Sequence, residues 1–431
     1  MLANFKANCK FVFHMANSYK NAKDTYAKFG VDTEKVLKTL DAIPLSMHCW
    51  QGDDVGGFET PDAELSGGGI QTTGNFPGKA RNPDELRADI AEALKYIPGQ
   101  TRLNVHACYG EFGGKKVDRN EISYEHFKGW VDWCKSMNLG MDFNPTYFSH
   151  PLSNDGFTLS SADKGIRNFW IEHGIACRKI AEKMGKALGK TVITNFWMPD
   201  GMKDFPADRL APRERMADSL DKIMKVKISK KYNKDSVECK LFGIGSESYV
   251  VGSHEFFMGY AVKNGLLLTL DSGHFHPTET IADKISSMLM FVPEILLHVS
   301  RGVRWDSDHV VISDDATISA MREVIRCDAT DRVHIGMDFF DASINRIYAW
   351  TVGMRAARKS LLIALLDPMK LMRDAENALD YGKRLALLEE SQNLPVAEVW
   401  AEYCRRTNTP CGIKMLDAIK KYETKVLLKR K

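Results

Sequence analysis

Short apolar segments alternate with amphipathic stretches along most of the chain. The apolar segments begin near eight positions: Pro44, Leu103, Gly140, Thr191, Val237, Leu266, Ile295 and Val333. Between them, apolar residues recur with helical spacing, which predicts helices over 83–96, 124–136, 166–188, 212–225, 281–291 and 317–327. Eight strand–helix repeats are what a (β/α)8 barrel requires. The sequence therefore predicts an α/β fold, a (β/α)8 TIM barrel with its site at the C-terminal ends of the strands.

The two ends of the chain lie outside this alternation. Residues 1–40 are expected to form an N-terminal helical segment, with one or two helices over 16–40, and 1–14 is a separable extension because Met15 is a second start. The barrel, as the catalytic domain, is assigned to 41–368, and a helical arm to 369–431. Because this arm has little of the barrel left to cover, we expect it to make oligomer contacts.

A long glycine-rich loop, residues 51–81, follows the first expected strand. Loops of this length in a compact domain are usually functional or disordered, and a position on the catalytic face suits a lid that excludes water. The triplet Gly67–Gly69 fits neither the Walker pattern nor Gly-x-Gly-x-x-Gly at the start of a helix, so the loop does not indicate nucleotide binding.

Composition narrows the classes of function. The 431 residues carry a net charge of +3, so there is no electrostatic argument for nucleic acid or a membrane surface as a partner. Nine cysteines occur without a Cys-x-x-Cys pair, which indicates reduced thiols and a cytoplasmic location. No apolar run approaches the ~18 residues that a membrane span needs.

Acidic residues and histidines gather at the ends of the apolar segments in the second half of the chain. They are Glu238, Asp271, His274, His298, Asp306, Asp308 and Asp338. Such groups are costly to bury unless a cation compensates them. Because the set offers oxygen and imidazole but no thiolate, it favours Mn²⁺, Mg²⁺ or Co²⁺ over a structural zinc.

Period-two alternation strengthens this interpretation. It places Glu238 with Lys240, Asp306 with Asp308, Asn104 with His106 and Asn195 with Trp197, each pair on one side of a strand. In a closed barrel, one side of each strand faces the lumen, so four polar pairs would point at one axis. Taken singly, Asp271 is also explained as a helix cap and His298 as a core histidine. Trp50 and Trp197 are candidate walls against which a sugar stacks, although isolated tryptophans are more often core.

Several longer motifs follow one another along the chain, and motifs of this length in this order are highly specific. They are 46–55 (SMHCWQGDDV), 75–82 (NFPGKARN), 142–145 (DFNP), 148–152 (FSHPL), 199–204 (PDGMKD), 240–245 (KLFGIG), 273–277 (GHFHP), 303–309 (VRWDSDH) and 334–343 (HIGMDFFDAS). With these motifs, the chain from about Met15 onward resembles the L-rhamnose isomerases.

The resemblance implies a barrel akin to xylose isomerase, a homotetramer, and interconversion of L-rhamnose and L-rhamnulose. It implies two metal sites per subunit, with Mn²⁺ as the ion and Co²⁺ or Mg²⁺ as alternatives. The structural metal would lie on Glu238, Asp271, His298 and Asp338, and the catalytic metal on His274, Asp306 and Asp308. Asp341 is an alternative to Asp338 as the last ligand. Lys240 and His106 would be catalytic and bind substrate, together with Trp50, Trp197 and Asp338.

The residue inventory favours a hydride shift between C2 and C1 over an enediol, because carboxylates bound to metal are poor bases. Three alternatives remain open. One is another divalent-metal barrel enzyme, an isomerase or epimerase with a different sugar preference, although no free carboxylate pair suggests itself for epimerisation. A second is a metal-stabilised sugar-binding protein without turnover. The third, a nuclease of the same barrel class, is disfavoured because no basic groove is expected at the site.

Overall fold

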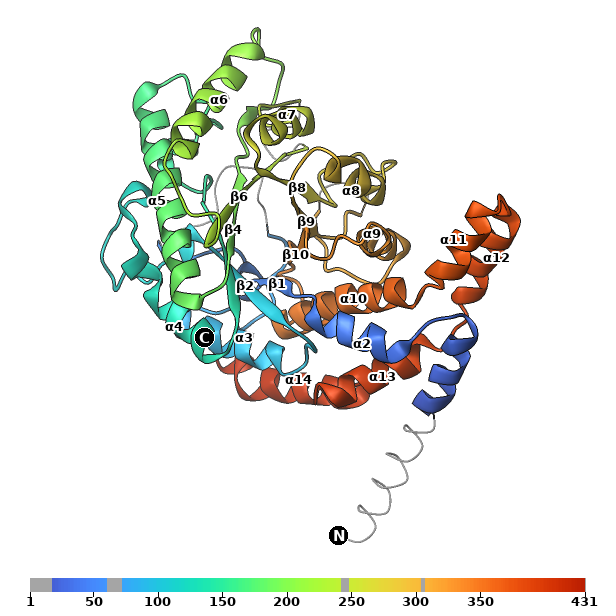
Figure 1. Ribbon diagram of the computed structural model, residues 1–431. Coiled ribbons are helices and arrows are strands. Elements are labelled where there is room, and N and C mark those ends of the chain that lie inside the picture. Colours follow the sequence, from blue (N-terminus) through green and yellow to red (C-terminus); the bar gives the residue numbers. More distant parts are fainter. Residues whose placement is uncertain (1–17, 60–71, 242–247, 304–306, 431) are drawn as a thin grey trace.

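The computed structural model describes residues 18–59, 72–241, 248–303 and 307–430. Eight parallel strands close into a barrel in the order β1-β10-β9-β8-β6-β4-β3-β2, with helices around it (Figure 1). The strands are β1 Leu45–His48, β2 Thr101–His106, β3 Gly140–Asn144, β4 Val192–Trp197, β6 Asn233–Glu238, β8 Leu267–Asp271, β9 Ile295–Val299 and β10 Val333–Met337. The predicted (β/α)8 TIM barrel is confirmed.

The observed strands begin close to the predicted positions, with one clear exception. Strand β6 begins at Asn233, four residues before Val237, because the polar residues Lys234 and Ser236 face a hydrogen-bonded lumen rather than water. The two-residue strands β5 Gly201–Met202 and β7 Tyr249–Val250 pair antiparallel outside the barrel.

The helices around the barrel are α3 Pro83–Leu94, α4 Lys128–Ser136, α5 Lys164–Leu188, α6 Leu210–Met224, α7 His254–Asn264, α8 Ile281–Leu289, α9 Asp315–Arg326 and α10 Arg346–Leu366. Side chains cap several of them: Asn82 accepts from the Glu85 amide at the start of α3, and Asp314 accepts from the Thr317 amide at the start of α9. The amphipathic pattern located six of these helices. It missed α7 and α10, and α10 is buried along most of its length and so has no polar stripe.

Short 3-10 turns follow several strands and carry residues to the C-terminal face of the barrel. They are η1 Trp50–Gly52, η2 Ala107–Tyr109, η3 Arg119–Glu121, η4 Tyr124–Phe127 and η5 Pro151–Ser153. A last turn, η6 Leu427–Lys429, lies near the end of the chain.

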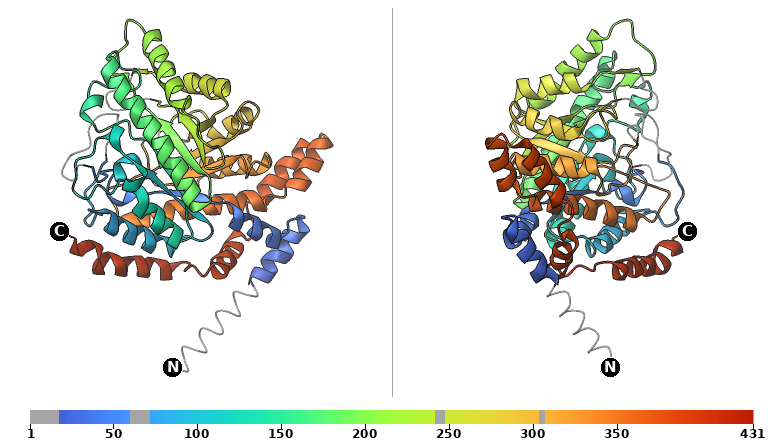
Figure 2. Two further views of the ribbon diagram at one scale, coloured as in Figure 1. Left: turned by 60° about the vertical axis from the view of Figure 1, so that its left-hand side comes forward. Right: turned by 90° about the vertical axis from the view of Figure 1, so that its right-hand side faces the viewer.

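The terminal segments are helical. Residues 18–28 form a helix and α2 spans Thr33–Ala42. After α10 come α11 Met369–Asn377, α12 Tyr381–Ser391, α13 Val396–Arg406 and α14 Ile413–Lys425. Figure 1 and Figure 2 show α11 and α12 standing out from the barrel, whereas α13 and α14 run along its side.

The end of the chain is tied to the loop that follows β1. Arg430 donates to both carboxylate oxygens of Asp89 on α3 and to the carbonyl oxygen of Gly78, at 3.0 Å. Gly78 has φ +86°, and a Cβ there would meet the Leu427 carbonyl at 2.5 Å. Only glycine therefore fits this contact. The C-terminal helices thus brace the barrel and one of its upper loops.

The lumen of the barrel is polar through most of its depth. At its lower end, Arg102 pairs with Asp142, and Lys234 and His334 both contact Glu294. A small apolar cluster of Ile193, Leu267 and Leu296 is separate from the main core. The main core lies instead between the outer face of the strands and the helices. This arrangement leaves the lumen available for polar chemistry.

Candidate metal centre and substrate cavity

Four predicted ligands converge at the C-terminal end of the barrel. Glu238, Asp271, His298 and Asp338 each offer one ligand atom, and these atoms lie within 4.8 Å of one another. They come from the ends of β6, β8, β9 and β10, where period-two alternation turns each side chain into the lumen.

His298 lies at the centre of the group. Its Nδ1 is 3.2 Å from Glu238 Oε1, 3.3 Å from Asp338 Oδ2 and 3.8 Å from Asp271 Oδ2. Burial disfavours the charged imidazolium, yet Glu238 and Asp338 together hold the pKa of His298 well above its usual value. One imidazole thus faces three carboxylates, and the group has an excess of negative charge.

The chemistry of this donor set fits a divalent cation. Burial raises the pKa of Asp271 to about 7. The charges of Glu238 and Asp338 raise this pKa further, whereas His274 lowers it. Asp271 Oδ2 is fully buried and has no hydrogen-bond donor among the described residues. A cation would satisfy that oxygen and relieve the repulsion between the carboxylates. Three carboxylates and one imidazole suit Mn²⁺, Mg²⁺ or Co²⁺.

Hydrogen bonds from deeper in the lumen orient Glu238. Ser236 and Thr269 bring their hydroxyl oxygens to 2.6 Å, and Thr269 donates to Asn195 Oδ1 at 2.7 Å. Asn195 Nδ2 in turn donates to Glu238 Oε2. Because Thr269 uses its only proton on Asn195, Ser236 must donate to Thr269. We call this directed chain from Ser236 through Thr269 and Asn195 to Glu238 the lumen relay. It fixes which end of the Asn195 amide faces the carboxylate.

The residues predicted for a second metal are only partly described. His274 and Asp308 both line the cavity beside the four-residue group, and His274 Nδ1 is 3.4 Å from Glu238 Oε1. Asp308 has φ +44°, and its carbonyl accepts from the Phe340 amide. Asp306 lies outside the described residues. The second set therefore stays a prediction.

Asp338, not Asp341, joins the group of four. Asp341 instead closes a turn, because its Oδ1 accepts from the Ser343 amide at 2.8 Å and from the Ser343 hydroxyl. Its backbone also exchanges two hydrogen bonds of 2.9 Å with Gln51. The sequence had left the choice between these two aspartates open, with Asp338 preferred by its position in the motif.

The remaining predicted residues line the same cavity. Lys240 is 6% exposed, and its Nζ lies 5.3 Å from the centre of the Trp197 ring. Trp50 packs edge-on against His106 at 4.9 Å. Burial, followed by the charge of Arg119, lowers the pKa of His106 to about 3, so its imidazole is neutral near pH 7. Asn104, the partner of His106 in the alternation, lies deeper in the lumen and does not line the cavity.

Sequence reasoning did not single out several other lining residues: Val55, Asn144, Phe148 and Phe340. Asn144 ends β3 and Phe148 follows four residues later, so the end of that apolar segment was the available signal. Val55 has φ +62°, which is uncommon for a β-branched residue. Bonds around it hold this conformation: Asp53 accepts from Tyr109 and from the Gly57 amide, and Arg346 forms two bonds with Asp54.

Comparisons with known proteins agree with this geometry. Residues 13–430 match the family described as L-rhamnose isomerase (RhaA). The chain belongs to the L-rhamnose isomerase family. The L-rhamnose isomerase of Rhodopirellula baltica is 56% identical over 97% of this chain and 97% of its own length. The L-rhamnose isomerase of Mannheimia succiniciproducens is 59% identical over 96% of this chain and 98% of its own length. Membership matches the resemblance inferred from the motifs.

The similarity to solved structures of other proteins is lower. An L-ribulose 3-epimerase structure has a TM-score of 0.47 at 12% identity, covering 78% of this chain and 97% of its own. In the part of the chain that the structure describes, no helix combines the length and apolar character needed to span a membrane.

Proposed function

We propose that this protein interconverts L-rhamnose and L-rhamnulose, with a divalent cation as cofactor. The observation that carries the proposal is the convergence of Glu238, Asp271, His298 and Asp338 beside a cavity that also holds Lys240. Family membership agrees with it. The alternative is another divalent-metal barrel isomerase or epimerase with a different sugar preference, since the far end of the sugar would be recognised by loop contacts.

Two sets of residues would hold two cations per subunit, with Mn²⁺ first and Co²⁺ or Mg²⁺ as alternatives. Glu238, Asp271, His298 and Asp338 would hold the structural ion, and His274, Asp306 and Asp308 the catalytic one. Bound there, a cation would act as a Lewis acid that polarises the substrate's oxygens.

We propose a hydride shift for the reaction. The hydrogen on C2 moves with its electron pair to C1, the C2 hydroxyl loses its proton, and O1 gains one. The clustered carboxylates would serve as ligands, so they are poor bases for the enediol route. Lys240 would donate to O1 as negative charge develops on it. His106, neutral and buried, would assist ring opening or position the ring oxygen. Trp50 and Trp197 would form walls that exclude water and orient the sugar.

We further propose a cytoplasmic homotetramer. We keep the division of the chain into residues 1–40, 41–368 and 369–431. Within the last segment, we propose that the α11–α12 hairpin makes the contacts between subunits. This hairpin carries three exposed apolar residues, Leu379, Tyr381 and Leu385, whose solvent-exposed fractions are 73%, 58% and 58%. A second copy of the chain would cover this face. Light scattering of the wild type and of Leu379→Asp tests the assembly; an unchanged mass would exclude the hairpin from the contact.

The experiment on function is a ketose assay after metal removal and Mn²⁺ addition, with L-rhamnose and a panel of other aldoses. Lys240→Met is expected to lower turnover by about 100-fold, the size typical of losing one donor to a developing oxyanion, with metal content unchanged. Lys222→Met on α6, an exposed lysine paired with Asp218, is the matched control. Deuterium on C2 should appear at C1 of the product. Washout into solvent would favour an enediol, and absence of any ketose would refute the assignment.

A further inference from the structure

A buried arginine organises three loops on the side of the cavity where His106 lies. Arg119 is 2% exposed and sits in η3, between β2 and α4. Its Nε and Nη2 both contact the carboxylate of Glu59, at 2.9 to 3.2 Å. The remaining guanidinium donors reach backbone carbonyls of the loop after β3. The five N–H groups of this side chain therefore all have acceptors.

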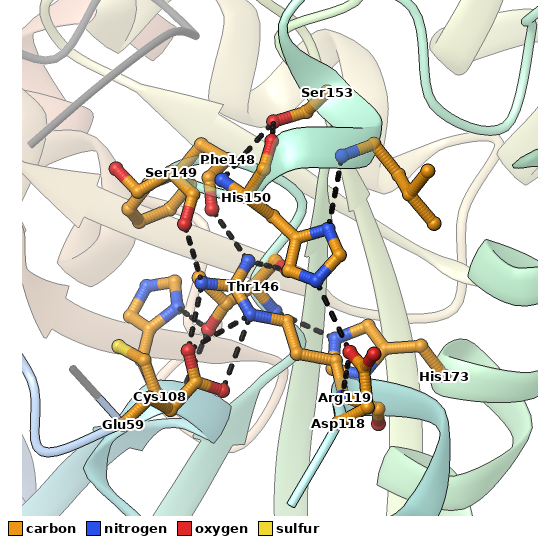
Figure 3. Close-up of polar contacts among 12 residues, drawn as sticks. Glu59, Cys108, Asp118, Arg119, Thr146, Phe148, Ser149, His150, Ser153 and His173 are labelled. Carbon is orange, nitrogen blue, oxygen red and sulfur yellow. Dashed lines mark hydrogen bonds and ion pairs between the residues drawn. The ribbon is translucent and has the colours of Figure 1, made fainter. Parts of the chain in front are cut away.

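The carbonyls in question belong to Thr146, Phe148 and Ser149 (Figure 3). The loop after β3 wraps around the guanidinium, and Ser149 in this loop has φ +53°. Glu59, from the loop after β1, balances the charge. Loops that follow β1, β2 and β3 are thus joined at one buried ion pair, which rigidifies the wall next to His106.

Thr146 is held at both of its backbone polar groups. Its carbonyl accepts from Arg119 Nη1 at 2.7 Å, and its amide donates to His173 Nε2 at 3.0 Å. His173 Nδ1 lies 2.9 Å from the Arg119 carbonyl, so His173 carries its proton on Nδ1 and donates there. With its backbone fixed in this way, Thr146 extends its hydroxyl toward His106 at the end of β2.

The hydroxyl of Thr146 meets His106. Its Oγ1 accepts from the Cys108 amide at 3.3 Å and lies 3.2 Å from His106 Nδ1. His106 Nε2 lies 3.4 Å from Asn144 Nδ2, and Asn144 also lines the cavity. Because an amide nitrogen donates, Nε2 accepts at this contact. The imidazole proton is therefore on Nδ1, where the Thr146 hydroxyl oxygen accepts it.

We propose that Thr146, fixed by Arg119 and His173, is a positioning residue that orients His106, with the imidazole proton on Nδ1 and the acceptor nitrogen Nε2 facing the cavity. Phe148, whose carbonyl Arg119 also holds, packs against the His106 ring at 5.7 Å and limits its rotation. His106 would then present an acceptor nitrogen to a sugar hydroxyl group. The role assigned to Thr146 in turnover rests on the proposed isomerase function, whereas the geometry it imposes on His106 does not.

The test uses variants of Thr146 in the full-length, Mn²⁺-loaded protein. Thr146→Val has the same shape without the hydroxyl and is expected to lower kcat between about 10- and 100-fold, the range for losing a group that orients a functional imidazole. KM for L-rhamnose, Mn²⁺ affinity and Tm should change little. Thr146→Ser retains the hydroxyl and should recover most of the turnover.

A double variant separates positioning from general damage. If Thr146 acts through His106, Thr146→Val should add nothing to the effect of His106→Asn, because coupled residues are not additive. An equal loss in both backgrounds would overturn the proposal. So would crystal structures of Thr146→Val and Thr146→Ser in which the His106 ring has the same orientation. If the wild type makes no ketose, the proposed function fails, and those two crystal structures still decide the positioning role.

The role of Arg119 can be tested with a double variant that leaves no buried charge unpaired. Arg119→Met together with Glu59→Gln removes both charges at once. This double variant is expected to show the kinetic effect of Thr146→Val, with kcat lowered and Mn²⁺ affinity retained. Normal kcat in a folded double variant would exclude Arg119 from the positioning of Thr146.

Discussion

The two ends of the barrel lumen both bury carboxylates, but they balance them differently. At the lower end, Asp142 accepts hydrogen bonds from Arg102, from the Ser46 hydroxyl and from the Ile193 amide. Although burial opposes ionisation, Arg102 holds the pKa of Asp142 below its usual value. At the upper end, Asp271 has no arginine or lysine partner among the described residues, only His298 Nδ1 at 3.8 Å, and burial raises its pKa to about 7.

The difference separates a structural arrangement from a binding site. A carboxylate with an arginine and a full set of donors has no capacity left for a ligand. A group of carboxylates around one histidine retains excess charge and an unsatisfied oxygen, and it gains most from a cation. Buried acids in the lumen therefore do not by themselves indicate a metal centre. A metal centre is indicated where the negative charge of the acids is only partly balanced by neighbouring residues.

The largest expected effect is at the upper end. Asp271→Asn should weaken Mn²⁺ binding by more than about 100-fold, because even changes behind the ligands cost 10- to 100-fold, and turnover should fall with it. The metal-free variant should be at least as stable as the metal-free wild type, since a repelled carboxylate is removed. Calorimetric Mn²⁺ titration and thermal unfolding check this. Unchanged Mn²⁺ affinity would exclude Asp271 as a ligand.

The corresponding substitution at the lower end should lower stability and leave Mn²⁺ affinity unchanged. Asp142→Asn leaves the buried Arg102 without its counter-charge, so the free energy of unfolding should fall by about 3 kcal/mol, the low end of the range for breaking a buried pair. Mn²⁺ affinity of the folded variant should remain near that of the wild type. Urea unfolding measures the first quantity and calorimetry the second. A loss of affinity without a loss of stability would contradict the comparison.

A smaller effect is expected from the lumen relay. Thr269→Val removes the donor that fixes the Asn195 amide, so Glu238 should lose its oriented partner and Mn²⁺ affinity should fall about tenfold. Thr269→Ser keeps the hydroxyl and is the matched control. Equal affinities for the two variants would mean that the Asn195 amide is oriented without Thr269.

An effect of similar size is expected from the pH dependence of metal binding. With the pKa of Asp271 raised to about 7, its carboxyl must lose a proton before it can bind a cation, so affinity should fall as pH drops below 7. From pH 8 to pH 6 the proton on Asp271 alone should account for about a tenfold fall. The pKa of His298 is also raised, so a proton that His298 releases adds to this fall. In the metal-free protein the same raised pKa makes stability fall as pH rises from about 4 to 7. Titrations at both pH values, in buffers of different ionisation enthalpy, count the protons released.

The barrel and the upper group could be predicted because both depend on local patterns. Apolar segments that end in acids or histidines placed Glu238, Asp271 and His298 at strand ends, and alternation turned them inward. Helix α10 was missed for a physical reason. A helix buried along most of its length has no polar stripe to give it a period, and its buried Arg346, Arg355 and Arg358 obscure its apolar character.

The supporting contacts could not be predicted from the sequence. The lumen relay joins residues on β4, β6 and β8, and the link from Arg119 to His106 passes through Thr146 and depends on the course of three loops. Neither has a characteristic spacing along the chain. Both depend on strand register and loop geometry, which exist only once the barrel has closed.

The contact between Arg430 and the Gly78 carbonyl has a practical consequence for handling the protein. A purification tag or fusion partner added after residue 431 would start one residue from a side chain that anchors α3 and the segment after β1. Placing it before residue 1 would leave that anchor undisturbed. Recombinant preparations that differ only in which end carries the tag should therefore not be treated as interchangeable.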